Sequence, residues 1–192
     1  MAIQTEATPG GGGEADPIAV LIGEGRFRDA LVHCTRTHAG SMGRLCMALL
    51  GDAAEAEEVL QESLVAAYHA MSGYRGEGSV RAWLHGIARR QCARRLTMRV
   101  RRERRLRLVH DASAPGAPLP DEELERRRRG ERVREALEEL KPSDREALLL
   151  RYETGLSFAE IASLQSIDEV AARKRASRAL ARLRTLLTEV DR

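Results

Sequence analysis

Apolar residues recur every three or four positions along most of the chain, which is the spacing of a helix with one buried face. Residues 52–71 follow this spacing closely, and their acidic residues fall on a different face. Residues 18–50 predict one or two helices, and Ser79 begins a long helix whose apolar positions include Trp83 and Leu84. The pattern is helical wherever it is regular, so we expect an all-α fold.

The C-terminal part of the chain predicts three helices with clear boundaries between them. Ser143 and Glu146, and again Ser157 and Glu160, have the Ser-x-x-Glu spacing of a capping box that begins a helix. The last helix is predicted over about 168–190, three residues after a short helix. A short helix, a turn of this length and a longer helix predict a helix-turn-helix.

Two segments without this pattern divide the chain. The first contains four consecutive glycines and little that is apolar, and the second is rich in proline and alanine and cannot hold a helix. We therefore predict two small helical domains joined by a flexible linker. The expected parts are a disordered tail over 1–17, a first domain over 18–108, the linker over 109–125 and a second domain over 126–192.

The composition supports a helical core and argues against two classes of protein. Only 3% of the 192 residues are aromatic and 43% are hydrophobic, so the core must consist mainly of Leu, Ala and Val. No apolar run reaches the roughly 20 residues that span a bilayer, and the N-terminus lacks the pattern of a secretory signal. The three cysteines, Cys34, Cys46 and Cys92, are too few for a disulfide framework. We therefore expect a cytoplasmic protein rather than a membrane or exported one.

Charged residues are distributed very unevenly, although the net charge is only +3. Residues 51–70 contain five acidic residues and no Lys or Arg, whereas residues 81–108 contain eleven Arg and one Glu. Residues 173–184 contain six basic residues and no acidic one. Of the 32 basic residues 30 are Arg, the side chain that forks onto phosphates and stacks on bases. The chain therefore has one acidic surface and two basic ones, and the basic surfaces indicate nucleic acid as a partner.

Several motifs occur together in an order that is typical of one protein family. Residues 49–62 read L-L-G-D-A-A-E-A-E-E-V-L-Q-E, residues 81–89 read R-A-W-L-H-G-I-A-R, and residues 148–162 contain L-L-L-R-Y, G-L-S-F and E-I-A. With these motifs in this order and spacing, the chain resembles a bacterial RNA polymerase sigma factor of the extracytoplasmic-function (ECF) group of the sigma-70 family. The resemblance covers about 27–107 and 131–187.

The resemblance implies that the first domain, region 2, binds core RNA polymerase through its acidic helix. In the family this helix docks on the coiled coil of the largest polymerase subunit, and region 4 meets the flap. The residues expected to form the polymerase-binding surface are Asp52, Glu55, Glu58, Gln61 and Glu62. The linker would thread between the two domains along the polymerase.

The resemblance also implies that region 2 recognises and opens the minus-ten element of the promoter. Opening DNA requires an aromatic surface for unpaired bases and cations along the freed strand. The residues expected to meet this element are Tyr74, Arg75, Arg81, Trp83, Arg89, Arg90, Arg94 and Arg95. Tyr74 is the better stacking candidate because we expect the ring of Trp83 to pack mainly in the core. Two positions depart from the family, because Arg90 replaces a common Asn and Arg94 a frequent Asp.

Region 4 of the family reads the minus-thirty-five element with the second helix of its helix-turn-helix. In this chain that helix has Ala and Leu on one face and Arg on the other, which suits a major groove. The residues expected to contact the element are Asp168, Glu169, Ala171, Arg173, Lys174, Arg175, Arg178 and Arg182. The turn glycine of the family is replaced here by Ser166.

The residues also allow other hypotheses. A stand-alone DNA-binding regulator would use only the helix-turn-helix and would leave the acidic helix unexplained. A sigma look-alike that titrates an inhibitor would have nearly the same sequence, but its DNA-facing Arg residues would be dispensable. His33, Cys34, His38 and Cys46 suggest a zinc site or a metal-dependent hydrolase, but no paired C-x-x-C accompanies them and no acid–base constellation is present.

The sequence contains no Gly-x-x-x-x-Gly-Lys loop of the kind that binds nucleotide phosphates, and stacking of one or two bases can bias DNA melting without hydrolysis. We therefore predict a protein that is not an enzyme and uses no cofactor or metal. The expected partners are core RNA polymerase and promoter DNA. The resemblance also allows an anti-sigma factor without naming one, and no membrane insertion is expected.

Overall fold

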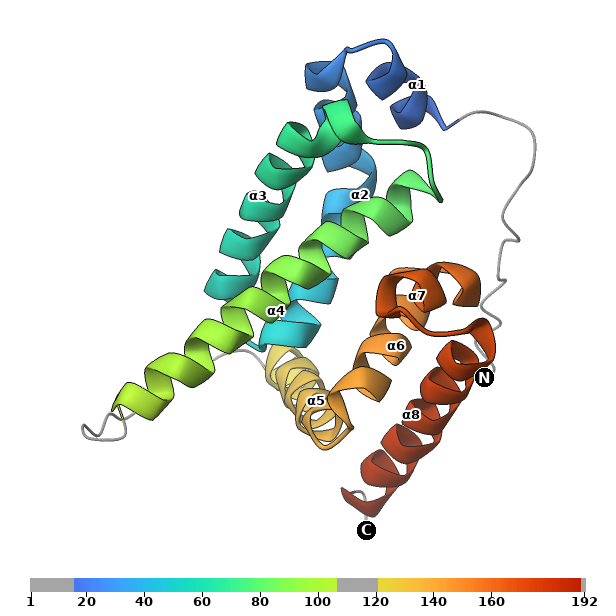
Figure 1. Cartoon of the computed structure of the whole chain (residues 1–192). Coiled ribbons are helices and arrows are strands. Elements are labelled where there is room, and N and C mark those ends of the chain that lie inside the picture. The colour runs from blue at the N-terminus through green and yellow to red at the C-terminus, as the bar shows by residue number, and fades with distance from the viewer. Residues whose placement is uncertain (1–15, 107–120, 191–192) are drawn as a thin grey trace.

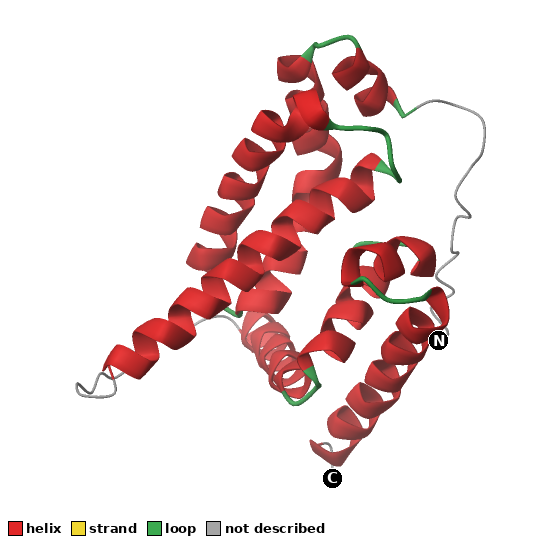
Figure 2. Cartoon of the chain, in the orientation of Figure 1, coloured by secondary structure: helices red, strands yellow, loops and turns green. Residues whose placement is uncertain are grey.

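The computed structural model describes residues 16–106 and 121–190, which form helices joined by short turns (Figures 1 and 2). In chain order the elements are α1 (Pro17–Gly23), α2 (Phe27–Leu50), α3 (Ala53–Ala70), the 3-10 turn η1 (Met71–Gly73), α4 (Val80–Leu106), α5 (Asp121–Glu138), α6 (Pro142–Tyr152), α7 (Phe158–Gln165) and α8 (Glu169–Val190). These residues form no strand, which confirms the expected all-α fold. None of the helices described has both the length and the apolar character that crossing a membrane requires.

Helices α1 to α4 form an N-terminal bundle in which α2, α3 and α4 pack along one another (Figure 1). Asp16 and Asp52 begin α1 and α3 by accepting hydrogen bonds from the backbone N–H groups of Ile18 (2.9 Å) and Glu55 (2.8 Å). Gly51 ends α2 in the left-handed conformation (φ 76°), which a residue without a Cβ adopts without strain. The resulting turn is short, so α2 and α3 are antiparallel neighbours.

Helices α5 to α8 form a C-terminal unit that contains the predicted helix-turn-helix. Ser157 and Glu160 form the expected capping box at the start of α7, where Ser157 Oγ accepts from Glu160 N–H (3.2 Å) and Glu160 Oε2 accepts from Ser157 N–H (2.8 Å). Asp168 begins α8 by accepting from the N–H of Ala171 (2.7 Å). Ser166 in the turn between α7 and α8 has a φ of 54° and is the one non-glycine residue with a positive φ among those described.

One expected helix start was wrong. Ser143 and Glu146 do not form a capping box, because α6 already begins at Pro142 with Lys141 as its N-cap residue. Proline suits the first helical position, since its ring fixes φ and an N–H would have no helical partner there. The side chain of Glu146 is therefore free to make a contact outside its own helix.

The linker ends earlier in the chain than the sequence pattern predicted. Helix α5 begins at Asp121, so residues 121–125 are helical. Residues 109–120 of the expected linker lie outside the described residues, as do residues 1–15 of the expected tail. At the other end of that tail, α1 begins at Pro17.

The buried apolar residues form two clusters, and the second cluster extends across both units. The first lies inside the N-terminal bundle and includes Met42, Val59 and Leu84. The second is centred on α6, α7 and α8, but it also contains Leu45 of α2 and Ala82 of α4. The two units are therefore packed against each other, a contact that the sequence pattern did not predict.

Two buried histidines lie between α2 and α4. His85 Nδ1 is 2.8 Å from the backbone carbonyl of Arg81, which can only accept, so Nδ1 carries the proton. Ser41 Oγ lies 3.1 Å from His85 Nε2 and donates to the backbone carbonyl of His38 at 3.0 Å. Burial lowers the pKa of His85 to about 4 and also lowers the pKa of His38. Both rings are therefore neutral core residues at neutral pH.

Replacing Ser166 by glycine should stabilise the protein. A residue with a Cβ is strained at a φ of 54°, so Ser166→Gly is expected to raise the free energy of unfolding by about 1 kcal/mol. Ser163→Gly in the neighbouring helix α7 is the control, and it should lower the stability by roughly 0.5–1 kcal/mol because its backbone is helical. Thermal and urea unfolding measure both free energies. A loss of stability in both variants, or a gain in both, would show that Ser166 is not strained.

Candidate functional site

A groove between α3 and α4 contains two of the five acidic residues of the acidic segment that the sequence indicated. Its walls combine charged, polar and apolar side chains, and Val65 and Met98 remain 56% and 57% exposed. The residues lining this α3–α4 groove are Glu58, Gln61, Glu62, Val65, Ala66 and His69 of α3 and Gln91, Arg94, Arg95 and Met98 of α4. Exposed apolar side chains beside paired charges are typical of a protein-binding surface.

The acidic residues of this groove have a counter-charge within the chain. Arg95 donates to Glu58 (2.7 Å) and to Glu62 (3.0 Å), so one guanidinium joins two carboxylates one helical turn apart. Hydrogen bonding and charge from Arg95 lower the pKa of Glu58. Asp52 caps α3 rather than lining the groove. Of the five residues expected to bind polymerase, the structure therefore brings Glu58, Gln61 and Glu62 to one surface.

The aromatic residues expected to meet unpaired DNA contact each other. The ring centroids of Tyr74 and Trp83 are 5.0 Å apart, with a tilt of 52°, at the N-terminal end of α4. The hydroxyl of Tyr74 donates to the backbone carbonyl of Gly78 (3.2 Å), which fixes the loop before α4. Burial raises the pKa of Tyr74. The pair is half-buried, so one edge of it faces solvent beside the exposed Arg75.

The arginines of α4 divide between two opposite surfaces. Arg94 and Arg95 line the α3–α4 groove, away from the aromatic pair. Arg89 instead faces the C-terminal unit, where it donates to Glu146 of α6 (2.5 Å) and to the backbone carbonyl of Leu164 of α7 (3.0 Å). Arg90 is exposed between these two directions. The eight residues expected at the minus-ten element therefore do not form one continuous surface in this arrangement.

The basic residues of helix α8 lie outside the stripe of its buried alanines, and two of them, Arg175 and Arg178, contact α7 and α6. The buried residues are Ala172, Ala176 and Ala179, which pack on α6 and α7. Asp168, Glu169 and Ala171 occupy the first turn, where Asp168 is the cap. Glu169 accepts from Arg173 (2.9 Å) one turn later, and the guanidinium of Arg173 lies 5.1 Å from the ring centroid of Phe158.

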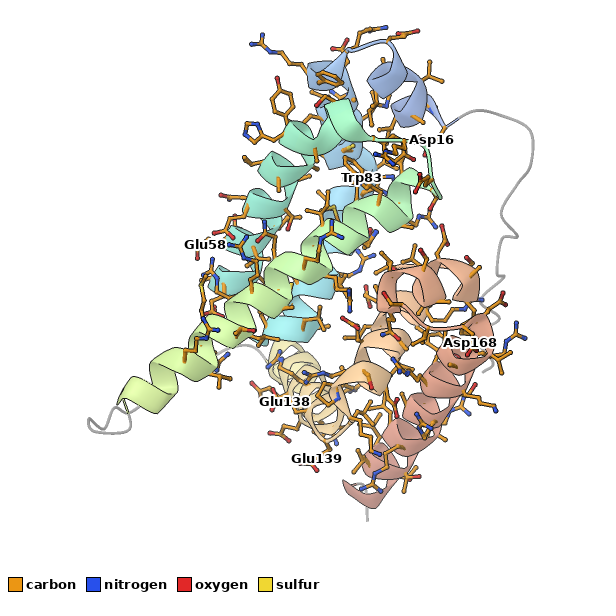
Figure 3. All side chains as sticks on the ribbon, in the orientation of Figure 1. Asp16, Glu58, Trp83, Glu138, Glu139 and Asp168 are labelled. Carbon is orange, nitrogen blue, oxygen red and sulfur yellow. The ribbon has the colours of Figure 1, made fainter. Side chains whose placement is uncertain are left out.

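Four of the α8 cations are held to different degrees. Arg178 donates twice to Asp144 of α6, at 2.8 and 2.9 Å, although its own side chain is 62% exposed. Arg175 donates to Gln165 Oε1 of α7 (3.2 Å). Lys174 is exposed on the outer face, as is Arg182. Figure 3 shows Glu58 and Asp168 on opposite sides of the molecule, so the acidic groove and α8 face away from each other.

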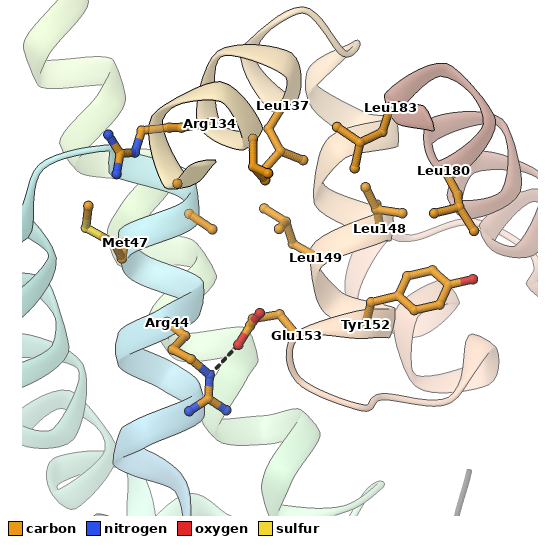
Figure 4. Close-up of a pocket in the computed structure, with 13 residues that line it drawn as sticks. Arg44, Met47, Arg134, Leu137, Leu148, Leu149, Tyr152, Glu153, Leu180 and Leu183 are labelled. Carbon is orange, nitrogen blue, oxygen red and sulfur yellow. Dashed lines mark hydrogen bonds and ion pairs between the residues drawn. The ribbon is translucent and has the colours of Figure 1, made fainter. Parts of the chain in front are cut away.

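A second groove runs between the two units and is largely apolar. It is lined by Met47 and Ala48 of α2 together with leucines of α5, α6 and α8, and Arg44 forms an ion pair with Glu153 across it (Figure 4). Tyr152 lies in its wall and is 61% exposed. The ring of Tyr152 points along the C-terminal unit, beside Leu180 (Figure 4).

The residues that suggested zinc do not converge. Cys34, His38 and Cys46 are buried in the first core, whereas His33 is exposed. Burial raises the pKa of Cys34 to about 11, which disfavours the thiolate that a metal needs. Across residues 16–106 and 121–190, no three His, Cys, Asp or Glu side chains are grouped so that they could hold a metal ion.

Comparison with known families assigns both helical units. The family model for sigma-70 region 2 matches residues 35–105, and the model for sigma-70 region 4 matches residues 130–183. The RNA polymerase sigma factor CarQ of Myxococcus xanthus is 31% identical over 170 residues, which cover 86% of this chain and 96% of CarQ. The chain belongs to the sigma-70 family. The N-terminal bundle is region 2, and the C-terminal unit is region 4.

Other relatives place this sigma factor in the ECF group, as the motifs indicated. The ECF RNA polymerase sigma factor SigG of Mycobacterium tuberculosis is 29% identical over 181 residues. That match covers 83% of this chain but 46% of SigG, so the chain spans about half of the length of SigG. The structure of CnrH in complex with the cytosolic domain of CnrY superposes with a TM-score of 0.66 at 25% identity, over 90% of this chain and 96% of CnrH.

The sigma factor RpoE of Bartonella quintana, solved in complex with the anti-sigma factor NepR, has the same fold. It superposes with a TM-score of 0.66 at 23% identity and covers 87% of this chain. The superpositions cover 99% of the RpoE chain and 96% of the CnrH chain. They support the all-α fold with regions 2 and 4.

Sequence reasoning missed the residues that connect regions 2 and 4. Asp144, Glu146 and Gln165 all hold arginines of the expected DNA-binding sets, yet none was singled out as functional. Glu146 was noticed only as a helix cap, which it is not. One feature of the sequence could have indicated a contact between helices. If Pro142 begins α6, Glu146 is not needed as a cap, so its carboxylate is available to another element.

Asp144→Asn should destabilise region 4 in a pH-dependent way. Arg178 holds the pKa of Asp144 below its usual 3.8, so the carboxylate stabilises the fold above that pH and loses its effect as pH falls further. The melting temperature of Asp144→Asn is therefore expected to be lower than that of the unmodified chain at pH 7, and the gap should close below about pH 3.8. Glu139→Gln, an exposed acid at the end of α5, should show no such gap. A gap that does not vary with pH would contradict the role of the carboxylate.

Proposed function

We propose that this sigma factor binds core RNA polymerase through the α3–α4 groove and directs promoter-specific transcription initiation. Region 2 opens the minus-ten element and region 4 reads the minus-thirty-five element. The observation that carries the proposal is the joint presence of both family regions with their charges segregated, acidic on α3 and basic on α4 and α8. Separate surfaces allow polymerase and DNA to be bound at the same time.

The α3–α4 groove suits a basic, helical protein partner. Glu58 and Glu62 lie one turn apart, with the exposed side chain of Val65 in the next turn. A partner arginine can replace Arg95 as the counter-charge of these carboxylates, so docking leaves neither carboxylate unpaired. Asp52 and Glu55 support the site from the first turn of α3, where acidic residues also favour the helix dipole.

The Tyr74–Trp83 pair is the proposed surface for an unpaired base. An aromatic surface at the end of a helix can stack a flipped base, and each stacked base contributes on the order of 1–3 kcal/mol. Arg75 is exposed next to Tyr74 in the chain, and the exposed Arg81 extends toward Gly155 of region 4; we assign both to the freed strand. We also assign Arg89 and Arg90 of α4 to the DNA surface, although Arg89 contacts Glu146 and Leu164 in this arrangement. The function requires no hydrolysis, so we propose an initiation factor that is not itself an enzyme and needs no cofactor.

Helix α8 is the proposed reader of the minus-thirty-five element. Its first residues, from Asp168 to Lys174, are placed to reach base edges, and its later arginines are placed to reach phosphates. Arg173 is oriented by the ring of Phe158 and by Glu169, which limits its freedom before DNA is bound. The apolar groove of region 4 around Leu180 and Tyr152 is the proposed contact for the polymerase flap.

A regulatory protein partner and a cytoplasmic location are part of the same proposal. CnrH was solved in complex with the cytosolic domain of CnrY, and RpoE with the anti-sigma factor NepR. By analogy with these proteins, we infer that an anti-sigma factor controls this chain. This chain would act where the polymerase acts, in the cytoplasm.

Charge reversal in the α3–α4 groove should abolish polymerase binding. Glu58→Lys with Glu62→Lys places two cations against a basic partner, and we expect at least tenfold weaker binding to core polymerase and no specific transcript in run-off assays. Glu57→Lys is the control, because Glu57 is exposed on the same helix but does not line the groove. Binding to a DNA duplex should survive in all variants. Undiminished polymerase binding by the double reversal would show that the groove is not the docking surface.

Neutralising exposed cations of α8 should flatten the salt dependence of DNA binding. Lys174→Ala and Arg182→Ala should each lower the slope of log K against log salt by about 0.9, since each removes one phosphate contact. Fluorescence anisotropy with a labelled duplex across a salt series measures the slope. Arg36→Ala on α2 removes the same charge from region 2 and should leave the slope unchanged. An unchanged slope for both α8 variants would remove α8 from the DNA interface.

A further inference from the structure

A chain of polar side chains joins the DNA-reading helix α8 to α4 of region 2. Arg175 donates to Gln165 Oε1 (3.2 Å), and Gln165 Nε2 donates to Glu146 Oε2 (2.8 Å). The other oxygen of Glu146 accepts from Arg89 Nε (2.5 Å). Arg89 also donates to the backbone carbonyl of Leu164 (3.0 Å). Glu146 is therefore linked directly to Arg89, which is expected at the minus-ten element. Through Gln165 it is also linked to Arg175, which is expected at the minus-thirty-five element.

Close packing surrounds this chain of contacts. A Cβ at Gly86 of α4 would meet Leu164 Cδ2 at 2.8 Å, so α4 and α7 approach as closely there as a glycine allows. Ser79 and Glu160 form a second polar contact between α4 and α7. The side chains of Arg89 and Glu146 are 27% and 18% exposed, so their ion pair is screened less than a surface pair. Figure 1 shows α7 beside the middle and N-terminal part of α4.

This contact excludes DNA from part of region 2. The guanidinium of Arg89 has its Nε on Glu146 and one terminal nitrogen on Leu164, so these two donors are not available to a phosphate in the same arrangement. A carboxylate that receives a guanidinium in this way offers the charge and the acceptor oxygens of a DNA phosphate. Arg175 is held through Gln165 by the same carboxylate.

We propose that Glu146 acts as an internal substitute for a DNA phosphate and holds regions 2 and 4 in a closed, autoinhibited form. This inference rests on the proposed function, because it requires Arg89 to belong to the DNA-binding surface. Opening exchanges the Glu146 contact of Arg89 for a phosphate contact, so the guanidinium stays paired, while Glu146 keeps its hydrogen bond from Gln165. DNA affinity of the free chain is reduced by the fraction of molecules that are closed.

Glu146→Gln tests the proposal with little change in shape. A glutamine has one acceptor oxygen and an NH2 group, so it cannot accept from both Arg89 and Gln165, and it removes the charge. Glu139→Gln is the matched control, since it removes the same charge from an exposed position of region 4 (Figure 3). Any general effect of net charge on DNA binding therefore appears in both variants.

The closed form is measured directly in the free chain. Spin labels on Glu57→Cys and Thr185→Cys, exposed positions of α3 and α8, report the distance between regions 2 and 4. Cys34, Cys46 and Cys92 are fully buried and should not be labelled. Glu146→Gln is expected to broaden this distance distribution and move it to longer values, whereas Glu139→Gln should match the parent chain. Gln165→Ala is a second variant that should shift it in the same direction by a smaller amount.

DNA binding is the second readout, with a labelled duplex of random sequence as the probe. Glu146→Gln is expected to bind about fivefold more tightly than Glu139→Gln, the lower end of typical coupling between linked sites. Its salt slope should be steeper by about 0.9, which is the phosphate contact that Arg89 gains. Opening without a gain in affinity would overturn the role of Glu146 as a phosphate substitute. Identical behaviour of the two variants in both assays would overturn the closed form itself.

The proposed function is tested separately by run-off transcription with core polymerase. A chain that opens on Glu146→Gln but directs no initiation would refute the proposed function and leave the closed form in place. A chain that directs initiation but shows the same distances in all variants would refute only the closed form.

Discussion

The ion pair between Arg89 and Glu146 lies where the two helical regions of this sigma factor meet, and the rest of the arrangement follows from it. It needs α4 and α7 to approach closely, which the missing side chain of Gly86 permits beside Leu164. With that contact made, one side of α4 is covered by region 4. The other side of α4 remains free to form the groove with α3. The same helix therefore separates a side covered by region 4 from the side on which we propose that polymerase binds.

Functional charges in this protein are paired internally before any partner arrives. Arg95 is bound to Glu58 and Glu62, Arg178 to Asp144, and Arg89 to Glu146. The chain has 32 basic and 29 acidic residues, so acidic partners are available for most of its cations. In the proposed binding modes an external partner competes with the internal one for the same charge, so binding depends on competition as well as on attraction. Such competition gives specificity and salt sensitivity at little cost in stability.

Much of the fold could be predicted because its signals are local. Asp52, Ser157 and Asp168 begin their helices with side chains that bond the backbone three residues ahead, and these contacts need nothing from elsewhere in the chain. The predicted start of α6 was wrong because the Ser143–Glu146 spacing indicates a capping box. Pro142 begins the helix instead, and a proline at the first helical position needs no side-chain cap. Helical periodicity and the motifs together were enough to identify the family.

By itself, the sequence determined the helices, their caps and the segregation of acidic and basic segments, since all of these depend on residues within about one turn of each other. Only the tertiary structure decided which charges meet. Arg89 and Glu146 are 57 positions apart, and Arg178 and Asp144 are 34 apart. Such partners depend on how whole helices pack, and many acidic residues compete for each arginine. No local pattern distinguishes the one acid that the packing brings within hydrogen-bonding distance.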